Sequence, residues 1–102
     1  MSIYRATTPT LTFTFPFSVS TIDELNLSFA QNRRVLFVLG INDVQIDADN
    51  DAVVVSLTQE QTTKFVPDVE VEIQFRVKVE GAVMASNIIQ TDTKRVLETE
   101  AL

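Results

Sequence analysis

The side chains that carry out most enzymatic and metal chemistry are missing from this sequence. It has no histidine and no cysteine, which excludes Ser-His-Asp and Cys-His nucleophilic systems and zinc sites built from nitrogen and sulfur ligands. Its two glycines, Gly40 and Gly81, match neither a Walker loop nor a dinucleotide-binding fingerprint. Acid–base chemistry would have to use lysine, Tyr4 or carboxylates such as Glu70 and Glu72, which alternate with apolar residues as on a solvated strand face. We therefore expect no catalytic residues, no cofactor and no enzymatic activity.

One acidic cluster has the spacing of a metal loop. Asp47, Asp49 and Asp51 are placed like the first three ligands of a calcium-binding loop. Such a loop needs glycine at its sixth position and glutamate at its twelfth, where this chain has Ala52 and Thr58. The cluster is thus a weak calcium candidate, and the alternative is a plain acidic turn between two strands.

The charge balance narrows the kind of partner. The chain has 102 residues, a formal net charge of −6 and a pI of about 4.4, which disfavours nucleic acid and anionic membrane surfaces as partners. The first residues lack an apolar signal core, and the longest apolar run, Val35 to Leu39, is only as long as a strand. We expect no signal peptide, no membrane-spanning segment and synthesis in the host cytoplasm, and a virion location is compatible with this.

The elements that must position any site are strands. The clearest one runs from Val69 to Val79, where six apolar residues alternate strictly with polar ones, so that one face is dry and the other wet. Similar patterns predict about seven strands, near residues 10–17, 25–31, 35–39, 44–46, 53–57, 69–79 and 83–96, the last one bent near Ser86-Asn87. Thr58 and Gln61 form a capping-box pattern that predicts a short helix from Gln59 to Lys64.

Strands of this number and spacing predict an all-β fold. We expect a single domain over residues 1–102, an immunoglobulin-like antiparallel sandwich with the helix between its fifth and sixth strands. The last few residues, Glu98 to Leu102, are expected to form a short disordered end.

Two segments are candidate protein interfaces. Alternating threonines line the first predicted strand and suit an assembly edge, although threonine is also a common residue on any exposed strand. The continuous apolar run that follows Arg34 indicates either a surface that meets a partner or a strand at the centre of a sheet. The interface candidates are therefore Thr10, Thr12, Thr14, Val35, Phe37 and Leu39.

Several motifs together resemble a known family. They are residues 7–13 (TTPTLTF), 15–17 (FPF), 57–62 (LTQEQT), 73–76 (IQFR), 85–88 (ASNI) and 96–98 (VLE). In this order and spacing the chain is similar to short prophage-encoded proteins of Gram-positive bacteria, and the resemblance covers nearly the whole sequence. It implies a phage context and a virion or tail-associated role. No catalytic residue is established for that family, so none is carried over.

We therefore expect a non-catalytic phage structural or assembly protein. Its partner would be a protein, either a second copy in a homo-oligomer or a larger phage protein. The alternative is a small sandwich that binds a host-surface carbohydrate, which would need exposed aromatic rings beside polar groups. Since most of the seven phenylalanines fall on predicted inward faces, this alternative is the weaker one.

Overall fold

A computed structural model describes residues 2–97 of the chain. The expected disordered end, Glu98 to Leu102, lies outside the described residues. Within them the elements are β1 (Ser2–Tyr4), β2 (Thr10–Thr14), β3 (Ile22–Gln31), β4 (Arg34–Gly40), β5 (Gln45–Asp47), β6 (Ala52–Ser56), α1 (Gln59–Thr63), β7 (Val71–Val79), β8 (Ala82–Ala85) and β9 (Ile89–Lys94).

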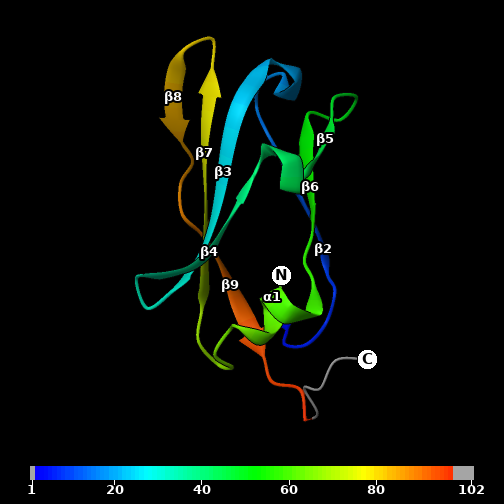
Figure 1. The fold of residues 1–102 in the computed structure, drawn as a ribbon, viewed down its shortest axis with the longest axis vertical. Helices are drawn as coiled ribbons and strands as arrows, with labels where there is room; N and C mark the ends of the chain where they lie inside the picture. The colour runs from blue at the N-terminus through cyan, green and yellow to red at the C-terminus, as the bar shows by residue number, and fades with distance from the viewer. Residues whose placement is uncertain (1, 98–102) are drawn as a thin grey trace.

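The strands form two sheets that face each other. The larger sheet has the order β1-β9-β7-β3-β4, with β8 also paired to β7, and the smaller sheet has the order β2-β6-β5. Figure 1 shows the two layers, with β3, β7 and β8 in one and β2, β5 and β6 in the other. The orders β9-β7-β3-β4 and β2-β6-β5 correspond to the G-F-C-C′ and B-E-D strands of an immunoglobulin-type sandwich. The predicted all-β sandwich is thereby confirmed.

The strand count and one pairing differ from the prediction. The described residues contain nine strands rather than about seven, because β1 was not predicted and the last predicted strand is divided into β8 and β9. The division confirms the expected bend. At this point the pairing with β7 is interrupted, and Ser86 donates its N–H to the Phe75 carbonyl while its side-chain Oγ accepts the Phe75 N–H. β1 runs parallel to β9, so the sandwich is not wholly antiparallel. Three residues are too few to show an alternating pattern, which explains why β1 was missed.

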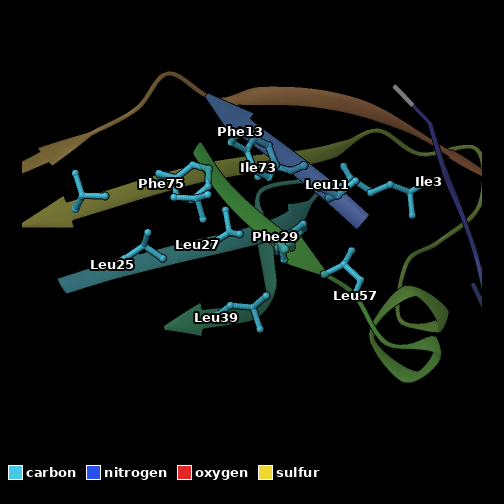
Figure 2. Close-up of a cluster of buried hydrophobic side chains, with 14 of the residues drawn as sticks. Ile3, Leu11, Phe13, Leu25, Leu27, Phe29, Leu39, Leu57, Ile73 and Phe75 are labelled. Atoms are coloured by element: carbon cyan, nitrogen blue, oxygen red, sulfur yellow. The ribbon is translucent and has the colours of Figure 1, made fainter. Parts of the chain in front are cut away.

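Alternate side chains of both sheets meet in one core. In β7 the residues Val71, Ile73, Phe75 and Val77 are all at most 5% exposed, so the predicted dry face of this strand is confirmed. Opposite them, the ring of Phe13 on β2 meets the Phe75 ring edge-on, with centroids 4.9 Å apart. Figure 2 shows these side chains converging between the layers with Leu27 and Phe29 of β3. Burying such rings supplies a large share of the stability of a small domain.

The helix closes one end of the sandwich. Thr58 caps it, because its Oγ1 accepts the Gln61 N–H at 3.1 Å and the Gln61 side chain accepts the Thr58 N–H at 2.9 Å. Phe65 follows the helix and is 1% exposed, packed in the core. Both the capping box and the docking of this ring match the prediction. No helix among the described residues is long and apolar enough to cross a membrane.

Candidate protein-interaction surfaces

The threonine edge, defined here as Thr10, Thr12 and Thr14 of β2, lies at one side of the smaller sheet. These side chains are exposed, whereas Leu11 and Phe13 between them point into the core. β2 pairs with β6 on one side, and no strand in residues 2–97 pairs with its other side. The strand expected as an assembly edge is therefore an open edge in this fold.

The hydrogen-bond register shows which backbone groups the open edge presents. Leu57 donates its N–H to the Pro9 carbonyl at 3.0 Å, and Phe15 donates its N–H to the Asp51 carbonyl at 2.8 Å. In an antiparallel ladder, bonded positions alternate along the strand. Odd-numbered residues of β2 therefore bond to β6, and the N–H and C=O groups of Thr10, Thr12 and Thr14 point away from it. These three residues thus expose their side chains to solvent and direct their backbone N–H and C=O groups toward the open side of the strand.

This edge also lacks the charges that commonly protect a strand edge. Proteins blunt exposed edges with charged residues, prolines or very short strands. No residue from 6 to 22 is charged, and the flanking Pro9 and Pro16 lie outside β2. By contrast, the edge strand β4 begins with Arg34, and the edge strand β5 has only three residues and ends with Asp47. Among these edges, that of β2 is the one best suited to accept another strand.

The apolar run Val35 to Leu39 forms most of β4, which is an edge strand of the larger sheet. The alternative of a strand at the sheet centre is therefore wrong. Two of the three interface candidates in this run do not lie on the surface as expected. Leu39 is only 7% exposed, and the Phe37 ring is partly buried and stacks on Phe29, with centroids 4.8 Å apart. Val35 is 55% exposed, as an interface residue must be.

The reason for these corrections is a bulge in β4. The pairing with β3 shifts between Phe29 and Ala30, so that Leu36 has no direct partner. A bulge changes which residues point outward, and Val38, which was not a candidate, is 50% exposed. A run that is apolar at every position contains no signal for the face that each side chain takes.

The outer face of the larger sheet is the surface that points away from the core. It bears a shallow groove of about 290 Å³, lined by Ser28, Ala30, Arg33, Val35, Glu72, Gln74 and Ile88. Val35 and Ile88 are each more than half exposed. Exposed aliphatic side chains around a groove are typical of surfaces that meet other proteins. Glu72 lies on this open strand face, and Glu70 directly precedes the strand.

The acidic turn does not gather its carboxylates. Asp47 accepts hydrogen bonds from the backbone N–H of Asn50 at 3.3 Å and from the Asn50 amide at 2.8 Å. Asp51 accepts the backbone N–H of Val19 at 3.4 Å. Within residues 2–97 no three histidine, cysteine, aspartate or glutamate side chains are grouped to hold a metal ion. Asp47 and Asp51 are thus engaged separately, and this arrangement gives the calcium alternative no support.

Comparison with known proteins adds no assignment to these surfaces. No protein-family model matches the chain, and no curated protein matches its sequence.

Proposed function

We propose that this protein is a non-catalytic phage or prophage assembly module that works through protein–protein contacts. In this proposal it belongs to the virion or to a tail-associated structure, and the threonine edge accepts a β-strand of a larger phage protein. The observation that carries the proposal is the uncharged, unpaired edge of β2. The phage context comes from the resemblance of the sequence motifs to prophage-encoded proteins.

Strand addition suits this edge energetically. An added strand would bond to the outward N–H and C=O groups of Thr10, Thr12 and Thr14, and each such bond contributes about 0.5–1.5 kcal/mol net. The exposed threonines are good cross-strand neighbours for an incoming β-strand. This mode of recognition, in which a partner extends an existing sheet, needs no pocket and no charged anchor.

The carbohydrate alternative has less support from the surface. Sugar sites commonly combine exposed aromatic rings with polar groups. The rings of Phe13, Phe29, Phe65 and Phe75 are buried, and the other phenylalanines, Phe15, Phe17 and Phe37, are partly buried and packed against the core. Only Tyr4, at 53% exposure, stands out as an accessible aromatic ring among the described residues.

The proposal is tested by changing the outward backbone of the edge. Thr12→Pro removes an N–H group that β6 does not use, so the sandwich should keep its fold while an added strand loses a bond and meets a bulky ring. Thr12→Val is the matched control, since it changes the side chain and keeps the N–H. We expect purified particles of the encoding phage to contain the wild type and Thr12→Val, and to be depleted of Thr12→Pro at equal expression.

Two results would count against the proposal. One is that the wild-type protein is absent from purified particles. The other is that Thr12→Pro, shown to be folded by circular dichroism, enters particles as well as the wild type does.

A further inference from the structure

The charges on the outer face of β7 follow an antisymmetric order. Every second residue along this strand points outward, and these positions read Glu72, Gln74, Arg76 and Lys78, while Glu70 is the exposed residue directly before the strand. Two negative charges precede the neutral residue and two positive charges follow it, at equal spacing. If the strand is reversed about Gln74, each glutamate position coincides with the position of a basic residue.

On the side of Gln74 that faces β3 and β4, the outer surface is small and neutral. Ser28 of β3 pairs with Gln74 on one side, and Val38 of β4 pairs with Ser28 beyond it. In the next row of the sheet, Ala30 of β3 pairs with Glu72 of β7 on one side and with Val35 of β4 on the other. The centre of the outer face is therefore a low surface with exposed aliphatic groups, which a second flat sheet can approach closely.

We propose that two copies of this chain pack outer face against outer face about a two-fold axis at Gln74. The axis lies between the faces and perpendicular to β7, so that the two β7 strands run antiparallel. Glu72 then lies opposite Arg76 of the partner subunit, and Glu70 lies opposite Lys78 of the partner subunit. The two-fold symmetry repeats each opposition, and Val38 meets Val38 of the partner subunit beside the axis.

The charge order is the reason why the occupant is a second copy. Copies with a net charge of −6 repel each other in most orientations, but this face offers both signs in an order that complements itself. Glu24 of β3 pairs with Lys78, and its negative charge weakens the attraction between Lys78 and Glu70 of the partner subunit. The attraction between Glu72 and Arg76 of the partner subunit therefore matters most. This surface is separate from the threonine edge, and the inference does not depend on the function proposed for that edge.

The test is a set of charge reversals read by sedimentation velocity over roughly 1 μM to 1 mM protein. The wild type should dimerise, more weakly at high salt because exposed charges are screened. Arg76→Glu and Glu72→Arg alone should each raise the dimer Kd about tenfold or more, since each makes like charges meet twice. The double reversal should restore the wild-type Kd, and so should an equimolar mixture of the two single variants.

Controls of the same charge change lie on the helix and at the residue that ends it, away from this face. Lys64→Glu matches Arg76→Glu, Glu60→Arg matches Glu72→Arg, and both side chains are exposed. Neither control should change the Kd more than about twofold. Equal melting temperatures across the set establish that the variants are folded.

Three outcomes would overturn the inference: a wild type that stays monomeric at the highest concentration, reversals that act no more strongly than their controls, or single variants that fail to rescue each other. Thr12→Pro should leave this dimer unchanged. Loss of the dimer and loss of strand addition at β2 are thus measured independently.

Discussion

Replacing Gln31 by methionine should remove about 3 kcal/mol of stability, although its buried side chain takes part in neither proposed contact. Gln31 is the last residue of β3 and is 4% exposed. Its Nε2 donates to the carbonyls of Val66 at 2.9 Å and Val69 at 3.1 Å, and its Oε1 accepts the Val66 N–H at 2.7 Å. This side chain therefore fixes the loop between α1 and β7 to the larger sheet.

The magnitude follows from these three bonds, because the fourth bond of this side chain, from Nε2 to Thr93 Oγ1, is long at 3.4 Å and therefore weak. Methionine has a similar length and is flexible enough to fill the same space, so the hydrogen bonds are the main difference. Each contributes about 1 kcal/mol net, and the loop groups left behind are partly buried. For a domain of this size, about 3 kcal/mol corresponds to a drop in melting temperature of about 12–24 °C.

Urea unfolding followed by far-UV circular dichroism measures this loss, since the chain has no tryptophan. The midpoint should fall while the denaturant slope stays constant, because the surface exposed on unfolding hardly changes. The control is Gln74→Met, which removes one bond to the Ser86 carbonyl at a half-buried site and should cost about 1 kcal/mol. A loss below about 1 kcal/mol for Gln31→Met would refute the reasoning, since water would then replace the side chain at little cost.

Substitutions at three further positions test other parts of the fold by the same unfolding measurement. Phe75→Ala should cost about 3–5 kcal/mol, because the ring is 2% exposed and packs on Phe13, and an unchanged melting temperature would contradict its place in the core. Thr58→Ala should cost about 1 kcal/mol through loss of the helix cap, whereas Thr58→Ser should keep most of it. Arg33→Gly should stabilise the chain by about 0.5–1 kcal/mol, since Arg33 has a φ of 65° in the β3–β4 turn, and a loss of stability would show that the arginine side chain offsets its backbone strain.

The sequence was most informative where polar and apolar residues alternate. The strict pattern of residues 69–79 predicted the buried face of β7, because side chains on a strand point alternately to its two sides. Local side-chain chemistry was equally informative at Thr58 and Gln61, whose reciprocal bonds depend only on neighbouring residues. The alternating pattern and the capping box both depend only on residues that are close together in the sequence.

The rest of the candidate surfaces depends on pairing between distant segments. The run Val35 to Leu39 is apolar at each position, so only its bulged pairing with β3 decides that Val35 and Val38 face outward while Leu39 faces the core. The openness of the β2 edge follows from strand order, which the pattern of a single strand does not contain. The aspartates of the β5–β6 turn have the spacing of metal ligands, but the turn directs Asp47 to Asn50 and Asp51 to Val19.

The parallel pairing of β1 with β9 has a consequence for synthesis. Ser2, Ile3 and Tyr4 lie beside Asp92, Thr93 and Lys94, so the first strand of residues 2–97 has no neighbour until the last strand of these residues has been made. Contacts between such distant positions form slowly, because the intervening chain must close into a loop first. Until β9 has been made, β1 therefore has no strand beside it among the described residues. The pairing that completes the larger sheet at β1 is therefore the one expected to form last as the chain is made.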